Sequence, residues 1–207
     1  MDSTAEITRS SYEHSAHNYA DATWEYENFP GLQVDALNFC ESLKAAGPVL
    51  DLGCGAGRDA NFFASRGKRV VAADISQAML REAHQRIAAF AEGQVDFVCI
   101  DIRNLPFREN CFSGVWASGS LLHVPRVDLL PSLRKISEVL SPGGVAALSM
   151  KNGIGEGWER LGAVSGPRWF TYVETATFSN LMRQAGFNSV SCHLSNRGTW
   201  FLATGNT

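Results

Sequence analysis

The sequence predicts a doubly wound α/β fold with a mostly parallel sheet. From residue 48 onward, short apolar segments alternate with longer segments of helical period, and this alternation requires right-handed crossovers with helices on both faces of the sheet. The last two predicted strands are separated only by Asn196-Arg197-Gly198, which predicts a hairpin and therefore an antiparallel strand at the end of the chain. The seven strands are expected at residues 48–52, 69–74, 95–100, 113–118, 144–150, 187–195 and 199–204.

Two helices are expected ahead of the sheet. The first spans 10–20, with Ser10 or Ser11 as its cap and Glu13 in its first turn, and the second spans 31–46 with apolar residues at helical spacing. The segment Pro142-Gly143-Gly144 predicts a helix stop and a turn into the fifth strand, whereas the segment after that strand is rich in glycine and predicted to be irregular. The remaining helices are expected at 57–66, 76–90, 126–140 and 174–185.

The length of 207 residues suffices for one well-buried α/β domain and is too short for two ordinary ones. We therefore expect the two N-terminal helices, within residues 1–46, to pack as a cap on a main domain formed by residues 47–207. The aromatic connection at residues 24–30 either packs on this domain or covers a ligand.

Composition and charge exclude several classes of function. The 18 basic and 21 acidic residues are scattered and give a formal charge of −3, so no basic face is expected for nucleic acid. Five cysteines without a C-x-x-C pair favour reduced core residues and no metal site. Residues 1–9 lack the apolar segment of a signal peptide, and no later apolar run is long enough to cross a bilayer. A cytoplasmic protein without membrane contact is expected.

The strongest motif is Val-Leu-Asp-Leu-Gly-Cys-Gly-Ala-Gly-Arg-Asp-Ala, at residues 49–60. A strand ends near an acid, Asp51, and Gly53, Gly55 and Gly57 then lead into a helix. Glycines without a Cβ allow unusual backbone conformations and close approach of a ligand, and the helix N-terminus offers free N–H groups. The segment predicts a ligand site.

Two ligand classes use such a turn. A dinucleotide places its pyrophosphate on the helix N-terminus, and the spacing Gly55-x-Gly57-x-x-Ala60 fits that pattern. The acid-bearing stretch from Asp51 to Cys54 then precedes the turn, where a carboxylate suits a cationic ligand better than a pyrophosphate. An NAD-dependent oxidoreductase therefore remains an alternative.

The form acid-x-Gly-x-Gly-x-Gly, at Asp51, Gly53, Gly55 and Gly57, resembles the first motif of the class I S-adenosylmethionine-dependent methyltransferases. The segment after the fourth strand, residues 117–125, is similar to the small-x-x-Leu-His-x-Pro form of the branch that methylates small molecules. The resemblance implies the strand order 3-2-1-4-5-7-6, S-adenosyl-L-methionine as cofactor with S-adenosyl-L-homocysteine as product, and an acceptor oxygen or nitrogen on a small molecule. A non-catalytic protein that binds this cofactor is the other alternative.

The resemblance also implies cofactor contacts at the strand ends. Asp74 would accept hydrogen bonds from the ribose hydroxyls or would instead cap the next helix, and Ile75 would lie along the adenine. Asp101 and Ile102 would contact the adenine edge, and Asp51 would serve the cofactor ammonium directly or through water. Arg58 would pair with the methionine carboxylate or lie on the surface. Tyr12 and Tyr19 share one face of the first helix and would either cap the cofactor or face the core. The other cofactor candidates are Cys54, the motif glycines, Ala117 and Ser118.

The acceptor pocket is expected beyond the fourth and fifth strands. Aromatic residues there can enclose an apolar acceptor, and basic residues favour a carboxylate or phosphate on it. His123 could act as a general base or only hydrogen-bond backbone, and Tyr19 is the second catalytic candidate. The expected acceptor-binding residues are His123, Lys151, Arg168, Trp169 and Tyr172.

Overall fold

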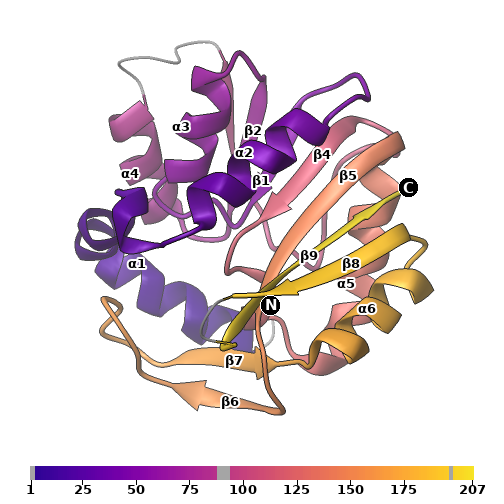
Figure 1. Ribbon diagram of the computed structural model, residues 1–207. Helices are drawn as coiled ribbons and strands as arrows, with labels where there is room; N and C mark the ends of the chain where they lie inside the picture. Colours follow the sequence, from indigo (N-terminus) through magenta and orange to yellow (C-terminus); the bar gives the residue numbers. More distant parts are fainter. Residues whose placement is uncertain (1–2, 88–93, 196–197) are drawn as a thin grey trace.

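The computed structural model describes residues 3–87, 94–195 and 198–207, and within them a seven-stranded sheet has the order β3-β2-β1-β4-β5-β9-β8 (Figure 1). Counted along the chain within this sheet, the order is 3-2-1-4-5-7-6, so the predicted order is confirmed. Strand β9 runs antiparallel to its neighbours β5 and β8, and the other pairs are parallel. The strands are β1 (Val49–Leu52), β2 (Val70–Asp74), β3 (Val95–Cys99), β4 (Phe112–Ala117), β5 (Leu140–Lys151), β8 (Asn188–Leu194) and β9 (Trp200–Asn206).

Helices cover both faces of this sheet, as the alternation of strands and helices predicts. In β1 the side chain of Val49 packs with helices on one face and that of Leu50 with helices on the other, and all four residues of the strand are buried. The helices on the face of Val49 are α2 (Leu32–Ser42), α3 (Arg58–Ser65) and α4 (Gln77–Ile87), and those on the face of Leu50 are α5 (Arg126–Val139) and α6 (Thr175–Gln184) (Figure 1).

Helix α1 (Ser3–Thr23) begins earlier than predicted and lies beside α4 and β7 rather than on the sheet (Figure 1). The predicted cap at Ser10 or Ser11 is wrong, because both residues lie inside the helix. Ser11 donates to the Pro167 carbonyl oxygen at 2.7 Å, so its hydroxyl serves a distant contact. Polar residues in its first turns thus hid the start of this helix.

A two-stranded sheet is formed by β6 (Gly155–Glu159), which lies in the segment predicted to be irregular, and β7 (Arg168–Tyr172), which follows that segment. Glycines in β6 weaken its strand pattern. Cross-strand packing compensates, since Trp158 and Trp169 are paired and their ring centroids are 5.4 Å apart at 81°.

Strand β5 also starts earlier than predicted, at Leu140, so that residues 142–144 lie within it rather than before it. The pairing with β4 shifts between Phe112, opposite Leu140, and Gly114, opposite Val145. The proline and glycines are accommodated at this irregularity, which is where a sheet tolerates them.

The predicted turn Asn196-Arg197-Gly198 falls partly outside the described residues, although β8 and β9 pair antiparallel as expected. In the described ranges, no helix has the length and apolar character that a bilayer span needs.

Candidate active site

A cavity lies at the carboxyl ends of β1, β2 and β4, where the strand order reverses, and residues of α1 form part of its lining. Its volume is about 100 Å³. Pockets that hold a drug-sized ligand usually enclose roughly 300–1,000 Å³. Helix α1 supplies one wall of the cavity, so a bound ligand would contact α1 as well as the strand ends. The wall includes Ala5, Thr8, Tyr12 and Tyr19.

The glycine turn is shaped by two tight contacts. Gly53 has φ +77°, and a Cβ there would stand 2.2 Å from Cβ of Ser120, whose hydroxyl donates to the Leu52 carbonyl oxygen at 2.6 Å. Gly57 has φ +84°, and a Cβ there would stand 2.7 Å from Cδ1 of Ile87. Gly53 thus borders the cavity, whereas Gly57 lets α3 start close against α4.

Asp74, at the end of β2, borders the cavity and holds the turn. Its Oδ2 accepts a hydrogen bond from Gly55 N at 2.9 Å, and its Oδ1 accepts one from Ser76 N at 2.9 Å. Burial raises the pKa of Asp74, and these backbone donors oppose the rise. Each oxygen keeps a lone pair for a further donor. Ser76 itself caps α4, because its hydroxyl accepts from Met79 N at 3.2 Å.

Behind the turn lie two buried carboxylates. Asp59 is 5% exposed and accepts hydrogen bonds from Tyr26 Oη, Trp116 Nε1 and Arg58 Nε at 2.7–2.8 Å. Asp51 is 2% exposed, and its Oδ2 has no hydrogen-bond partner among the described residues. Burial, reinforced by Asp59, raises the pKa of Asp51 well above its usual range. The sequence motif contained Asp59, but its position in α3 gave no sign that it binds these three side chains.

Arg58 does not lie free on the surface. Its guanidinium packs over the rings of Tyr26 and Phe29 at 4.9 and 4.7 Å and donates to the Thr23 carbonyl oxygen at 3.0 Å. The side chain is 15% exposed and does not line the cavity. The aromatic connection after α1 is thereby packed against the start of α3. The contact of Arg58 with a cofactor carboxylate stays a prediction.

Tyr12 and Tyr19 meet over the cavity, as expected from their shared helix face. Their ring centroids are 5.3 Å apart at 89°, and a Cβ at Gly55 would stand 3.5 Å from Cε1 of Tyr19. Burial raises the pKa of both phenols, so both are protonated at neutral pH.

His123 belongs to a hydrogen-bonded chain. Its Nδ1 lies 2.6 Å from the Trp169 carbonyl oxygen, which can only accept, so Nδ1 carries the hydrogen. Its Nε2 then accepts from Tyr12 Oη at 2.8 Å, and Tyr12 Oη in turn accepts from Arg168 at 3.0 Å. Burial, together with Arg168 and Lys151, lowers the pKa of His123 to about 3. The imidazole is neutral at pH 7, and its lone pair is already used.

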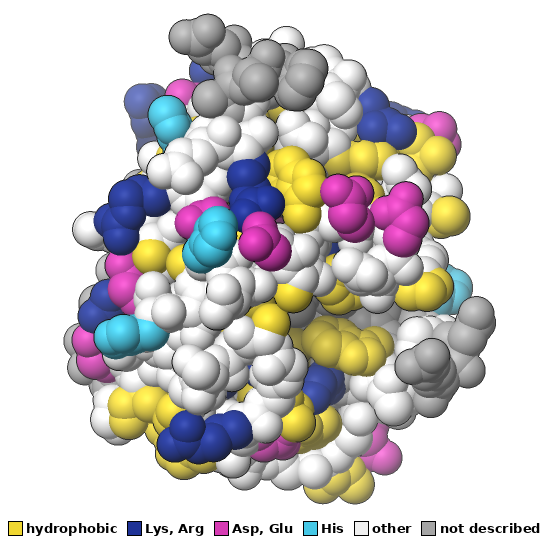
Figure 2. Space-filling model, turned by 90° about the vertical axis from the view of Figure 1, so that its left-hand side faces the viewer, with side chains coloured by type: hydrophobic (Ala, Val, Ile, Leu, Met, Phe, Trp, Pro, Cys, Tyr) yellow, Lys and Arg dark blue, Asp and Glu magenta, His cyan; other side chains and the backbone are white. Residues whose placement is uncertain are grey.

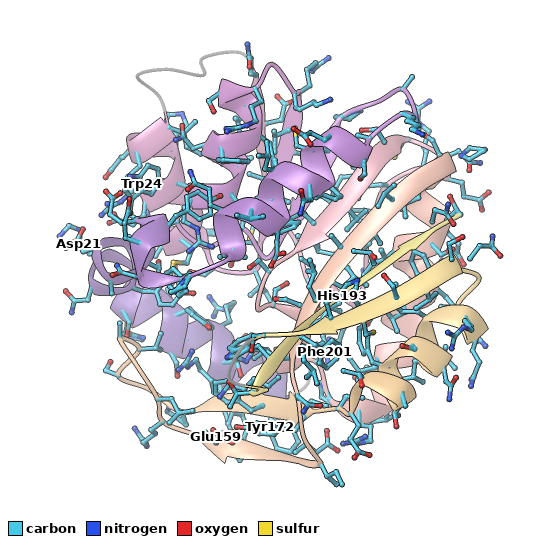
Figure 3. All side chains as sticks on the ribbon, viewed as in Figure 1. Asp21, Trp24, Glu159, Tyr172, His193 and Phe201 are labelled. Atoms are coloured by element: carbon cyan, nitrogen blue, oxygen red, sulfur yellow. The ribbon has the colours of Figure 1, made fainter. Side chains whose placement is uncertain are left out.

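Lys151, at the end of β5, lies among aromatic rings. Its Nζ is 4.5 Å from the centroid of Phe170, 5.3 Å from that of Tyr172 and 5.9 Å from that of Trp200. It donates to Tyr172 Oη at 3.4 Å, and that hydroxyl donates to Glu159 Oε1 at 2.6 Å; Figure 3 shows Tyr172 and Glu159 side by side. Burial lowers the pKa of Lys151, and in the described part of the chain no carboxylate forms an ion pair with it.

The structure brings many of the residues predicted for the cofactor and the acceptor to one cavity and places the others outside its lining. Those lining the cavity are Tyr12, Tyr19, Gly53, Gly55, Asp74, Ile75, Asp101, Ile102, Ser118 and His123, whereas Asp51, Cys54, Gly57, Arg58, Ala117, Lys151, Arg168, Trp169 and Tyr172 do not line it. Asp101 also receives several hydrogen bonds from Arg103, the shortest at 2.7 Å. Sequence reasoning missed Thr8, Ser120 and Trp200, whose residue types and spacing carry no recognisable pattern.

Comparison with known proteins agrees with this geometry. Residues 49–144 match the family model of a methyltransferase domain. The chain is 34% identical over 109 residues to methyltransferase GfsG of Streptomyces halstedii, covering 52% of this chain and 38% of that protein. It is 31% identical over 134 residues to malonyl-[acyl-carrier protein] O-methyltransferase of Salmonella typhimurium, covering 63% and 51%. The chain spans about half or less of the length of these relatives.

Solved structures share the fold at lower identity. The 1,6-didemethyltoxoflavin-N1-methyltransferase of Burkholderia thailandensis, solved with that substrate and S-adenosylhomocysteine, has a TM-score of 0.78 at 21% identity and covers 100% of this chain and 91% of its own. The [4+2]-cyclase SpnF has a TM-score of 0.66 at 20% identity, with 84% and 81% covered. The resemblance drawn from the glycine motif is confirmed: residues 49–144 match a methyltransferase domain, and the chain has the fold of methyltransferases solved with S-adenosylhomocysteine.

Proposed function

We propose that this protein is an S-adenosylmethionine-dependent methyltransferase acting on an oxygen or nitrogen of a small molecule that bears an acidic group. The observation that carries the proposal is the placement of Asp74. Its carboxylate borders the cavity at the end of β2, is held by Gly55 of the glycine turn, and keeps lone pairs for two vicinal hydroxyls.

The residues present fit this cofactor. Gly53 borders the cavity, where its missing Cβ leaves room for Ser120, and the unpartnered Oδ2 of Asp51 behind the turn suits an ammonium group, directly or through water. Asp74 would hold the ribose, Ile75 and Ile102 would enclose the adenine, and Asp101 would accept from its amino group. Tyr12 and Tyr19 would close over the methyl-bearing end.

The same contacts disfavour NAD. A pyrophosphate on the turn would need the N–H of Gly55, which is already bonded to Asp74. It would also lie near Asp51 and Asp59, two buried carboxylates close to the start of α3. The fold alone does not decide between methyl transfer and other chemistry, since the cyclase SpnF shares it, and a protein that binds the cofactor without transferring its methyl group is the second alternative.

S-adenosylmethionine, when bound, supplies a sulfonium methyl group that an acceptor atom takes by in-line displacement. Holding the two reacting atoms in line can supply roughly 7–11 kcal/mol of the barrier. Tyr12, fixed by Arg168 and His123, is the side chain placed to do this. His123 itself is a weak proton acceptor, because its pKa is about 3 and its Nε2 is occupied. An acceptor group that loses its own proton readily in water needs no base from the protein. The weak basicity of His123 therefore favours an acceptor group that is itself acidic.

Lys151 is the residue best placed to bind an acidic group. Arg168 is 7% exposed and donates to Tyr12 Oη and to the Leu161 carbonyl oxygen, so it links α1 to the segment between β6 and β7. Lys151 makes one long hydrogen bond and has spare N–H donors within a ring of aromatic side chains. An anion there would restore part of the solvation that burial removed.

The proposal is tested with S-adenosylmethionine labelled in the methyl group and a panel of aromatic and aliphatic hydroxy acids, each paired with its methyl ester. We expect label transfer to acids and not to the esters. Lys151→Met should lower transfer to the best acid about tenfold or more, and Lys44→Met, at an exposed site, should not. Equal labelling of acids and esters would contradict the acidic acceptor, and no labelling of any acceptor would favour a non-catalytic binding protein.

A further inference from the structure

Glu13 of α1 binds the N-terminus of a different helix, α4. Its Oε2 accepts from the Ser76 hydroxyl at 2.6 Å, and its Oε1 accepts from Ala78 N at 3.1 Å. The first N–H groups of a helix lack partners within it, and a carboxylate there also meets the positive end of the helix dipole. The contact is a charged cap supplied by a neighbouring element.

This cap is continuous with the proposed cofactor site. Ser76 N donates to Asp74 Oδ1, and Gly55 N donates to Asp74 Oδ2, both at 2.9 Å. One chain of hydrogen bonds therefore runs from the glycine turn through Asp74 and Ser76 to Glu13. Ser76 is fully buried, so leaving its hydroxyl without an acceptor would lower the stability of the folded state.

The opposite side of α1 is fastened to the segment that leads into β7. Trp169 N donates to Thr8 Oγ1 at 3.0 Å, and Ser165 N donates to Ser15 Oγ at 3.1 Å. Ser11, between them on the same helix face, donates to a backbone oxygen of this segment. Thr8, Ser11 and Ser15 are all buried. The strand ends and turns that border the cavity, with Gly55 and Asp74, form a cofactor wall, and His123 with residues 165–172 forms an acceptor wall. Helix α1 joins these two walls (Figure 1).

We propose that Glu13 is a positioning residue that fastens α1 across the bound cofactor, so that cofactor binding also builds the acceptor wall. The inference rests on the proposed function. Residues of α1 line the cavity, so a cofactor bound there contacts α1 and stabilises its position. A stabilised α1 keeps Thr8, Tyr12 and Ser15 on their partners at residues 165–169 and at His123. The acceptor wall is therefore more firmly held once the cofactor is bound.

The other polar contacts between α1 and α4 hold the two helices together less strongly than the contact of Glu13 does. On the face that carries them, basic, acidic and histidine side chains stand beside one another (Figure 2). Asp21 pairs with Arg86 at 2.5 Å and His17 lies 3.4 Å from Glu82, but Asp21 and His17 are 61% and 73% exposed. Exposed ion pairs add little to stability because water screens them. Glu13, by contrast, accepts from the fully buried Ser76 hydroxyl.

The test measures backbone hydrogen exchange of the full chain with and without S-adenosylhomocysteine. We compare the parent with Glu13→Gln and, as a matched control, Glu6→Gln, an exposed residue of the same helix that pairs with Arg9. In the parent and the control, the compound should slow exchange at residues 165–169 at least tenfold. In Glu13→Gln this slowing should be lost, and the compound should dissociate at least about tenfold faster. Parent-like slowing and dissociation would overturn the proposal.

A second variant keeps the test sharp if Glu13→Gln folds poorly. Ser11→Ala with Ser15→Ala cuts only the acceptor side of α1. It should bind S-adenosylhomocysteine within threefold of the parent and show slowed exchange in α1, but no slowing at Ser165, whose N–H loses its acceptor on Ser15. Slowing at Ser165 in this variant would overturn the coupling. Absence of binding to the parent would instead overturn the proposed function itself.

Discussion

The two walls of the site are built in different ways. The cofactor wall comes from strand ends and the turns after them, and its key contact joins Gly55 to Asp74, only 19 positions apart. The acceptor wall depends on side chains far apart in the chain: Tyr12 meets His123 across 111 positions and Arg168 across 156. The first wall is a property of the local fold, whereas the second exists only when α1 and the β6–β7 hairpin are both in place.

The largest effect is expected from breaking the cofactor wall at Gly53. In Gly53→Ala the new Cβ would stand 2.2 Å from Ser120 Cβ, at a backbone φ of +77°. The left-handed strain of roughly 1–2 kcal/mol lowers stability, whereas overpacking of up to about 3 kcal/mol against Ser120 displaces the border of the cavity and should lower S-adenosylhomocysteine affinity on the order of 10²-fold. Calorimetric titration measures this loss.

Gly67→Ala is the matched control, because Gly67 has φ +75° and a Cβ added there would meet no atom within 4 Å. It should lower the melting temperature through backbone strain and leave the affinity unchanged. Equal affinity losses in the two variants would show that backbone strain, and not the contact with Ser120, sets the effect.

The second effect separates the two roles of Asp74. Asp74→Ala should weaken S-adenosylhomocysteine binding by about 1–3 kcal/mol, because charge-assisted hydrogen bonds to the ligand and to Gly55 are lost. Asp96→Ala, at an exposed residue of β3 that pairs with Arg69 at 3.4 Å, should leave binding unchanged. Parent-like binding in Asp74→Ala would mean that Asp74 serves only backbone N–H groups.

The smallest effect is expected in the acceptor wall, at His123. His123→Gln should lower turnover by less than about tenfold with a cofactor affinity like the parent's, whereas loss of a general base would cost about 10²-fold or more. Turnover is measured with the acceptor found by the labelling experiment. A loss of the larger size would restore His123 as a base.

The pH dependence of stability reports on the same residue. The folded pKa of about 3 lies below the unfolded value near 6.5, so the unfolded chain binds a proton that the folded chain does not. Stability is therefore fully present above about pH 6.5 and falls as the pH is lowered toward 3. In denaturant titrations, the loss between pH 7 and pH 5 should be smaller in His123→Gln than in the parent. Equal losses would place the titration elsewhere.

The contrast between the walls explains what the sequence could predict. The alternation of strands and helices and the glycine turn follow from periodicity and from residues close in the chain, whereas the strand order and the cofactor contacts of Asp74 and Ser118 were implied by the resemblance to the methyltransferase family. The hairpin β6–β7 was missed because its glycines carry no strand pattern. Glu13 could be expected only as a residue of its own helix, since nothing in the spacing indicates that it caps another one.

The acceptor residues show the same limit. Lys151 and Arg168 are both basic, so the same role was expected of both. Only the structure separates them, because Arg168 is committed to Tyr12 and to backbone while Lys151 keeps free donors among aromatic rings. Such pairings across more than a hundred positions leave no periodic signal in a single sequence.

The most direct test of the central claim is calorimetric titration of the full chain with S-adenosylhomocysteine and, separately, with NAD. We expect micromolar or tighter binding of S-adenosylhomocysteine and no measurable binding of NAD, because Gly55 is bonded to Asp74 and the turn is backed by carboxylates. Micromolar binding of NAD without binding of S-adenosylhomocysteine would contradict the claim.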